Sequence, residues 1–310
     1  MRIAVMGAGA VGGYFGALLA KAGHDVAFIA RGEHGAAMQS QGVRLEGPRG
    51  DLVIRNIEVV EDPGQLAPCD VTLFCVKTYD TESAALAVRP LIARGGVVIS
   101  LQNGVDGQDR IGRVIGDDCV MGGLAMVSGV IASPGVIRYK SEMSSLQFGE
   151  ADGSMSGRAT AFADACNAAG FKAEVMPDIR KAQWSKFVGL CSNAALTSLM
   201  RLPVGHIYHR EEGIALGLAA FREVEAVGRA EGIDLPVDIV DRALKLHQGF
   251  PPSMYASMYH DVARGRRLEL ESFSGLVVRL GKKHGIPTPV HGMAYACLLP
   301  FLDGAPAALG

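Results

Sequence analysis

The chain opens with a glycine pattern that constrains its fold more than any other feature. A short apolar segment, 3–6, precedes an Ala- and Leu-rich helical stretch, and a second apolar segment, 26–30, follows it. Three glycines in the spacing G-x-G-x-x-G join the first two: Gly7, Gly9 and Gly12. Such a turn offers backbone N–H groups and the positive end of a helix dipole to a pyrophosphate. The order therefore predicts a dinucleotide-binding β-α-β unit.

Each glycine of this turn has a distinct expected role. Gly7 permits the tight turn, Gly9 lets the backbone approach a phosphate, and Gly12 lets the helix pack on its strand. We expect the whole turn to bind the cofactor: Gly7, Ala8, Gly9, Ala10, Val11 and Gly12. A secretory signal is the competing interpretation, because Arg2 and a hydrophobic run precede 20–22, Ala-Lys-Ala. The glycine spacing and the strand pattern that follows favour the dinucleotide unit.

Composition excludes several classes of function. With 310 residues and 49% hydrophobic content, the chain is long enough for two domains. Its net charge is −2 and it has no basic run, so neither nucleic acid nor a membrane surface is an expected partner. The later apolar stretch 187–200 is shorter than the roughly 20 residues that span a bilayer. Six cysteines without paired spacing indicate reduced, mostly buried thiols in a cytoplasmic protein.

The first half of the chain alternates apolar segments with helical ones, which predicts a parallel sheet covered by helices on both faces. The expected strands are 2–6, 26–30, 52–60, 71–76, 97–101 and 119–127, and the expected helices are 11–22, 33–41 and 81–93. A hairpin is expected at 43–55, and a turn at 133–135 before short strands at 136–140 and 145–149. These segments predict an α/β domain of the Rossmann type.

After about residue 150 the pattern becomes helical. The expected helices are 155–169, 179–200, 210–232, 236–248 and 252–284. We place the join between the domains near 171–177, which gives a nucleotide-binding domain at 1–174 and a mainly α-helical domain at 175–310.

Polar residues follow three of the expected strands. Arg31 stands where an NAD-binding enzyme usually has an acid for the ribose 2′-hydroxyl, and a guanidinium suits the 2′-phosphate of NADP. Glu33 lies close and leaves NAD open. Lys77 and Asn103 follow strands of the parallel sheet, at the edge where such sheets bind ligands. A solvated lysine and a turn asparagine are the alternatives.

The helical half contains a second set of candidates. Lys186 and Asn193 lie seven residues apart, on nearly the same face of an expected helix, with Leu190 and Ala194 beside them. A lysine at the surface is the alternative for Lys186.

Two further pairs of polar residues are weaker candidates. Of Glu269 and Glu271 only one can face a cleft, and pairing with Arg266 or Arg267 is the alternative. The pair His206 and His209 lacks the spacing and context of a zinc site, so no metal is expected.

These residues together resemble the ketopantoate reductase family (2-dehydropantoate 2-reductases, the NADPH enzymes of pantothenate synthesis). The resemblance runs nearly end to end and rests on these segments: Gly7–Gly12, Arg31, Val76-Lys77, Gln102-Asn103-Gly104, 184–187, Ser257-Met258, and Glu269 with Ser274-Gly275. It implies a helical domain similar to that of 6-phosphogluconate dehydrogenase, and a small-molecule 2-oxo acid as the partner. Such a helical domain favours a homodimer.

The resemblance also implies roles for single residues. Lys186 would be the general acid, Asn103 would hold the nicotinamide ribose and the substrate oxygen, and Glu269 would orient the lysine or bind the substrate. Lys77 would contact the cofactor and Ser257 the substrate carboxylate. The chemistry is consistent, because hydride delivery places negative charge on a carbonyl oxygen that an ammonium group stabilises and protonates.

One departure from the family limits what carries over. Its members place asparagines four and eight residues after the catalytic lysine, where this chain has Leu190 and Ala194, with Asn193 one step early. Ketopantoate reduction and reduction of a bulkier 2-oxo acid therefore both remain open. A non-catalytic NADPH-binding redox sensor and an opine-type dehydrogenase are the further alternatives.

Overall fold

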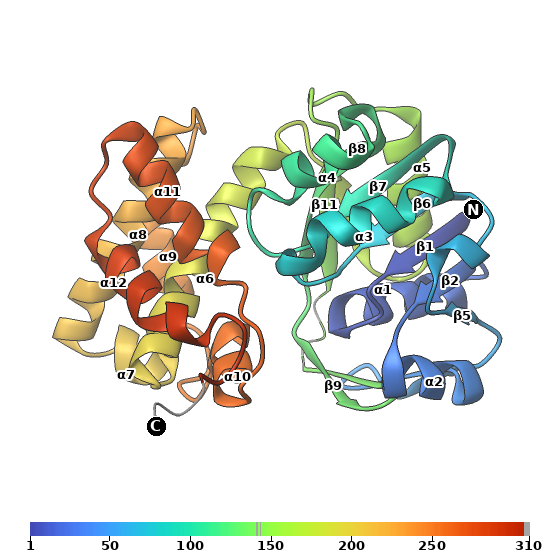
Figure 1. Cartoon of the computed structure of the whole chain (residues 1–310), viewed down its shortest axis with the longest axis horizontal. Coiled ribbons are helices and arrows are strands. Elements are labelled where there is room, and N and C mark those ends of the chain that lie inside the picture. Colours follow the sequence, from blue (N-terminus) through green and yellow to red (C-terminus); the bar gives the residue numbers. More distant parts are fainter. Residues whose placement is uncertain (141, 143, 307–310) are drawn as a thin grey trace. The chain divides into compact units, whose positions relative to one another are not determined.

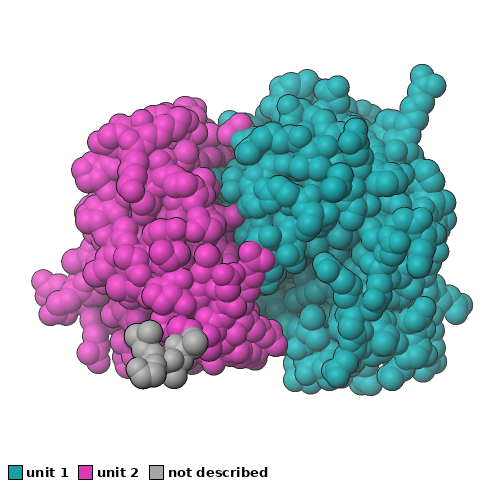
Figure 2. All heavy atoms as spheres, in the orientation of Figure 1, with its two compact units in different colours: residues 1–179 teal, residues 180–310 magenta. Residues whose placement is uncertain are grey.

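An α/β part and a helical part follow each other along the chain, which confirms the fold class expected from the sequence. The computed structural model describes residues 1–140, 142 and 144–306. Contacts divide the chain into unit 1, Met1–Ile179, and unit 2, Arg180–Gly310, which Figure 2 colours separately. Strands occur in unit 1, whereas the described part of unit 2 contains helices and their connections but no strand.

Unit 1 is built on an eight-stranded sheet with the order β12-β11-β8-β7-β6-β1-β2-β5 (Figure 1). Its strands are β1 Arg2–Met6, β2 Asp25–Ile29, β5 Glu58–Val60, β6 Cys69–Phe74, β7 Ile92–Ser100, β8 Val120–Met126, β11 Ser145–Gly149 and β12 Lys172–Val175. Neighbouring strands run parallel, except for the antiparallel pair β8–β11. The central strands are apolar on both faces, as expected for strands covered from both sides.

Helices cover both faces of this sheet, as the alternating pattern predicts. The helices are α1 Ala10–Lys21, α2 Gly32–Gln41, α3 Thr81–Val88, α4 Gly107–Ile115 and α5 Gly157–Ala168. Ile3 and Val5 of β1 belong to a core that includes residues of α1 and α5, whereas Ala4 and Met6 belong to one with residues of α3 and α4. Successive side chains of a strand point to opposite faces, so β1 joins both cores.

A second, four-stranded sheet has the order β4-β3-β10-β9. Its strands are β3 Val43–Glu46, β4 Leu52–Ile54, β9 Gly129–Ser133 and β10 Val136–Tyr139. The predicted hairpin at 43–55 is confirmed as β3–β4. The prediction of one strand at 52–60 is wrong, because the chain turns after β4, with the N–H of Ile57 bonded to the carbonyl of Arg55, and continues as β5 in the large sheet.

Unit 2 contains helices joined by turns and irregular segments. They are α6 Ile179–Met200, α7 Val204–Tyr208, α8 Glu211–Ala230, α9 Ile239–Gln248, α10 Ser257–Ala263, α11 Ser274–His284 and α12 Pro289–Leu298. The prediction of one helix over 252–284 is wrong. The chain leaves the helical conformation at Gly265, whose φ is +60°, and an irregular segment with the 3-10 turn η5, Leu270–Ser272, separates α10 from α11.

The helices and the cysteines bear on two expectations from the composition. Among the described residues, no helix combines the length and the apolar character that crossing a bilayer requires. The six cysteines are free thiols. Three of them are buried, Cys69, Cys166 and Cys191, while Cys297 is exposed, so "mostly buried" overstates their burial.

The start of α12 is held by a carboxylate from α8. Glu223, which is buried, accepts the backbone N–H of Val290 through Oε1 at 2.8 Å and that of His291 through Oε2 at 2.9 Å. The first N–H groups of a helix have no partner within the helix, and a negative charge at this end interacts favourably with its dipole. Glu223 therefore ties α8 to α12 inside unit 2.

We expect Glu223→Ala to lower the free energy of unfolding of unit 2 by about 2–4 kcal/mol, because two N–H groups, one buried and one partly buried, lose their acceptor. Glu225→Ala on the same helix is the control; Glu225 pairs with Arg229 one turn on, and removing such a partly exposed pair costs about 0.5 kcal/mol or less. Urea unfolding followed by circular dichroism measures both. Equal losses in the two variants would contradict the capping role.

Candidate functional site

The glycine turn after β1 has the geometry expected of a phosphate-binding turn. Gly7 has φ +94°, and a Cβ there would lie 2.9 Å from the backbone nitrogen of Val76. A Cβ on Gly12 would lie 2.3 Å from the carbonyl oxygen of Gly7, so the helix approaches the turn closely. Neither position accepts a side chain without movement of backbone. The turn and the start of α1 are therefore held in one conformation.

Gly9 differs from its neighbours because it faces open space. It is the N-cap residue of α1, with φ −70°, and its carbonyl accepts the N–H of Gly13 at 2.8 Å. In the described part of the chain, no atom outside its immediate neighbours comes within 4 Å of the place that a Cβ would take. A group can thus approach the backbone at this point, beside the N–H groups of the first turn of α1.

The turn lies where the order of the sheet reverses. β1 pairs with β2 on one side and with β6 on the other, and β6 pairs with β7. Lys77 follows β6 and Asn103 follows β7, so both come after the carboxyl ends of strands that neighbour β1 or each other. Open α/β sheets bind ligands at such a reversal. Both side chains are half-buried.

Gln102 links the segments that carry these two residues, and its role was not anticipated from the sequence. Its amide nitrogen donates to the carbonyl of Val76 at 3.1 Å and to the hydroxyl of Thr81 at 2.9 Å. The buried amide therefore holds the segment before Asn103 against the segment before Lys77. In the sequence, Gln102 stands out only as part of the segment Gln102-Asn103-Gly104, on which the family resemblance rests, and no role was assigned to it.

Arg31 is the N-cap residue of α2, two positions after the end of β2, and it lies on an exposed part of the chain. Glu33 lies in the first turn of the same helix. The carboxylate of Glu61 accepts the N–H of Gly32 at 3.0 Å, which places a second acid beside Arg31. Glu61 follows β5 and carries no motif of its own, so sequence reasoning missed it.

Lys186 is the eighth residue of α6, is half-buried, and has a lowered pKa. Burial lowers the pKa of its ammonium group to about 8, since the charged form loses hydration. Phe187, the next residue, packs edge to face on Phe273, with ring centroids 6.0 Å apart. Phe273 directly follows η5, so this contact holds α6 against the segment that carries Glu269.

A buried histidine makes a second link between the same elements. The ring of His291, on α12, lies 3.1 Å from the hydroxyl of Ser274 at Nδ1 and 3.4 Å from that of Ser192 at Nε2. Ser192 belongs to α6 and Ser274 begins α11. Burial lowers the pKa of His291 to about 4, so the ring is neutral near pH 7. The link is therefore a network of neutral groups.

The two glutamates of the irregular segment differ in their surroundings. Glu269 precedes η5 and is 6% exposed. Glu271 accepts the hydroxyl of Tyr295 at 2.6 Å and pairs with Arg279. The pairing considered from the sequence, with Arg266 or Arg267, is wrong for Glu271, because α11 brings Arg279 to it instead.

The remaining candidates on unit 2 lie on two helices. Leu190 is half-buried on α6, Ala194 is 1% exposed, and Ser257 begins α10 on an exposed part of the chain. Asn193 is buried, and its Oδ1 has no hydrogen-bond partner among the described residues. A buried acceptor without a donor carries an unfavourable free energy that a donor group would relieve.

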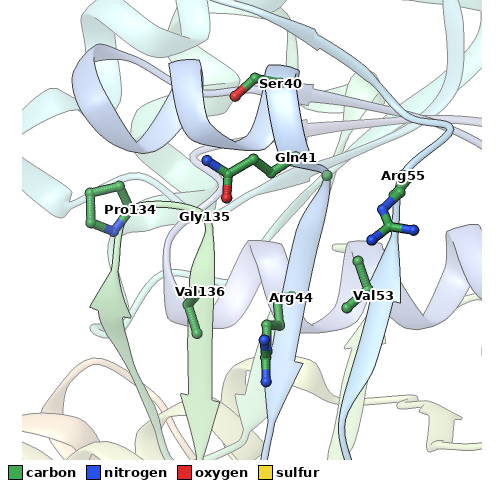
Figure 3. Close-up of a pocket in the computed structure, with 9 residues that line it drawn as sticks. Ser40, Gln41, Arg44, Val53, Arg55, Pro134, Gly135 and Val136 are labelled. Atoms are coloured by element: carbon green, nitrogen blue, oxygen red, sulfur yellow. The ribbon is translucent and has the colours of Figure 1, made fainter.

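A cavity of about 400 Å³ lies elsewhere on unit 1 (Figure 3). Its lining residues come from the end of α2, from the small sheet and from the segments next to them, and they include Arg44 and Arg55. Arg31 caps the opposite end of α2, so this cavity is separate from the candidate cofactor residues. In the part of the chain that is described, no group of three or more His, Cys, Asp or Glu residues could hold a metal ion.

Comparisons with known proteins agree over both units. The family model described as ketopantoate reductase PanE/ApbA matches residues 3–153, and that of its C-terminal domain matches 178–300. The 2-dehydropantoate 2-reductase of Archaeoglobus fulgidus is 31% identical over 291 residues, 94% of this chain and 94% of that protein. That of Caulobacter vibrioides is 31% identical over 298 residues, 96% and 97% of the two chains.

Solved structures show the same likeness. The crystal structure of a PanE/ApbA family ketopantoate reductase from Ralstonia eutropha JMP134 has a TM-score of 0.90 and 34% identity, and covers 97% of this chain and 98% of that one. A D-mandelate dehydrogenase complex with NADH and anilino(oxo)acetate has a TM-score of 0.88 at 21% identity, over 97% and 98% of the two chains, which shows a shared fold. The chain therefore belongs to the ketopantoate reductase family, and it is an oxidoreductase acting on CH–OH groups.

Proposed function

We propose that the protein reduces a 2-oxo acid to a 2-hydroxy acid with NADPH, and that ketopantoate is the substrate. The observation that carries the proposal is Lys186, a half-buried ammonium group with a pKa of about 8 in a chain of this family. Such a group is protonated in most molecules at pH 7 and gives up its proton more readily than an ordinary lysine. This is the acidity that a general acid needs near neutral pH.

The residues of unit 1 fit a dinucleotide. The open space at Gly9 and the N–H groups at the start of α1 suit a pyrophosphate, and Arg31 suits the 2′-phosphate of NADP. Glu61 and Glu33 lie near Arg31 and could bond a ribose hydroxyl instead, so the preference for NADPH depends on the guanidinium. Lys77 and Asn103 are the proposed contacts on the neighbouring strands.

The chain's own groups handle the proton and the orientation. Bound NADPH would supply the hydride. The ammonium of Lys186 donates a proton to the carbonyl oxygen as negative charge develops there, and it stabilises that charge before the transfer. Glu269, four residues before Phe273, is the proposed partner that orients the lysine or the substrate. Ser257 is the proposed donor of a hydrogen bond to the substrate carboxylate.

A bulkier or more apolar 2-oxo acid is the second candidate substrate. Leu190 and Ala194 occupy positions where the family has asparagines, and Asn193 is buried. A site that lacks an amide for a substrate hydroxyl discriminates less strongly in favour of that hydroxyl. The ratio of kcat/KM for ketopantoate to that for larger apolar 2-oxo acids separates the two candidates.

We expect the turnover of ketopantoate to fall at least about a hundredfold in Lys186→Ala, because the reaction loses its proton donor. The loss of NADPH absorbance measures this turnover. Lys181→Ala is the matched control on α6, since Lys181 pairs with the exposed Asp234. Activity in Lys186→Ala within a few-fold of wild type would exclude this catalytic role.

NADPH binding without turnover of any 2-oxo acid would favour the redox sensor, and turnover that requires an amine would favour an opine-type dehydrogenase.

The acidity of Lys186 gives the expected pH dependence. The pKa is lowered to about 8, so the group loses its proton earlier than an ordinary lysine as pH rises. We expect kcat/KM for reduction to be constant below about pH 8 and to fall about tenfold per pH unit above it. A profile that is flat to pH 10 would contradict the assignment.

The open space at Gly9 predicts a variant that separates folding from binding. Gly9→Ala should change the stability by less than about 1 kcal/mol, since its Cβ meets no described atom. It should weaken NADPH binding at least about tenfold, because the methyl group occupies the space beside the phosphate donors. Gly157→Ala, at the open start of α5, is the control, and NADPH fluorescence measures both. Unchanged affinity in Gly9→Ala would exclude the turn as the phosphate site.

Arg31→Ala tests the choice of cofactor. We expect the Kd for NADPH to rise about 10- to 100-fold through loss of charged hydrogen bonds to the 2′-phosphate, while the Kd for NADH changes less than about threefold. Arg94→Ala, at an exposed position of unit 1, is the control. Equal losses for both cofactors, or none for either, would remove the guanidinium as the selector.

A further inference from the structure

His34 connects the phosphate turn to two other elements of unit 1. It is the third residue of α2 and is half-buried. Its Nε2 lies 2.9 Å from the carbonyl oxygen of Ala8, which is inside the glycine turn. Its Nδ1 accepts the backbone N–H of Gly135 at 3.1 Å, in the turn between β9 and β10. One side chain thus bonds two backbone segments that are far apart in sequence.

The two contacts require one form of the ring. A carbonyl oxygen can only accept, so Nε2 carries a hydrogen, whereas Nδ1 accepts and carries none. Gly135, which donates to the ring, is itself held in place, because its carbonyl accepts the N–H of Arg44, in β3, at 2.9 Å. The ring of His34 therefore links the small sheet to the glycine turn through a continuous set of hydrogen bonds.

The contact with Ala8 determines the direction of the next N–H group. The peptide between Ala8 and Gly9 is planar and trans, so its carbonyl and its N–H point in opposite directions. When His34 holds the carbonyl of Ala8, the N–H of Gly9 is directed away from the ring. A turn that binds an anion must present N–H groups and withdraw carbonyl oxygens, since oxygen and phosphate repel each other.

We propose that His34 is a positioning residue of the phosphate turn: it holds the Ala8–Gly9 peptide in the orientation that binds the cofactor's pyrophosphate. The inference rests on the proposed dinucleotide, and it adds a residue that touches neither the phosphates nor the reacting atoms. The donor at Nε2 carries this role, and the acceptor at Nδ1 anchors the ring to the β9–β10 turn.

Three variants separate these two contacts. His34→Gln places an amide nitrogen near the position of Nε2 and can still donate to Ala8. His34→Asn places an amide oxygen near the position of Nδ1 and can still accept from Gly135, but it does not reach Ala8. His34→Phe keeps the ring and loses both bonds. Gln39→Ala, at an exposed position of α2, is the control.

The experiment measures the Kd of each variant by fluorescence titration with NADPH, or with NADH where wild type binds NADH more tightly, without any 2-oxo acid. We expect the Kd to rise about tenfold in His34→Asn and in His34→Phe, the effect of one lost hydrogen bond, and less than about threefold in His34→Gln. Thermal unfolding of each variant without cofactor reports the structural effect separately.

Three outcomes would overturn the inference. Affinities equal to wild type in all three variants would show that the turn keeps its form without His34. An equal loss of cofactor affinity in His34→Gln and His34→Asn, in proportion to the fall in their unfolding temperatures, would show a purely structural role. A wild-type protein that binds neither cofactor would overturn the proposed function as well, whereas cofactor binding without turnover would overturn that function alone.

Discussion

The candidate cofactor site depends on the parallel hydrogen bonding of β1 to β6 and of β6 to β7. The register pairs Val5 with Leu73 and Leu73 with Ile99, and all three side chains are fully buried. A slip of one residue would exchange the side chains between the two faces of the sheet, where different helices cover them. The register therefore brings the ends of three strands to one edge. The glycine turn, Lys77 and Asn103 come after these strand ends, in the order β1, β6 and β7.

In unit 2, hydrogen bonds between buried polar groups fix how the helices pack, as strand pairing fixes the sheet in unit 1. Glu223 holds the start of α12, and His291 from that helix reaches Ser192 and Ser274. Each group is hydrogen-bonded, so burial carries no penalty for unpaired donors, and the network defines how three further helices meet around α6. Lys186 lies on that helix. Burial within the protein lowers the pKa of its ammonium group.

The features that could be predicted from the sequence are those with local causes. The turn at Gly7, the helix after it and the hairpin at 43–55 follow from glycines and apolar periodicity within about twenty residues. Strand β9 lacks that signal because most of its side chains are exposed, and the break near Gly265 was hidden in a continuous helical pattern. In the candidate site, residue types in motifs were found, whereas the linking contacts of Gln102 with Val76 and Thr81 and those of His34 were not, because these partners lie 21 to 101 positions away.

The continuity of unit 1 along the chain has a consequence for the order of synthesis. Its large sheet uses strands between residues 2 and 175, and the last of them, β12, forms an edge of that sheet. Every partner that the sheet requires has therefore been made before the ribosome translates most of α6. Domains fold as units during synthesis, the N-terminal one first. The large sheet of unit 1 can therefore form while the later helices of unit 2, which follow the helix of the proposed proton donor, are still being translated.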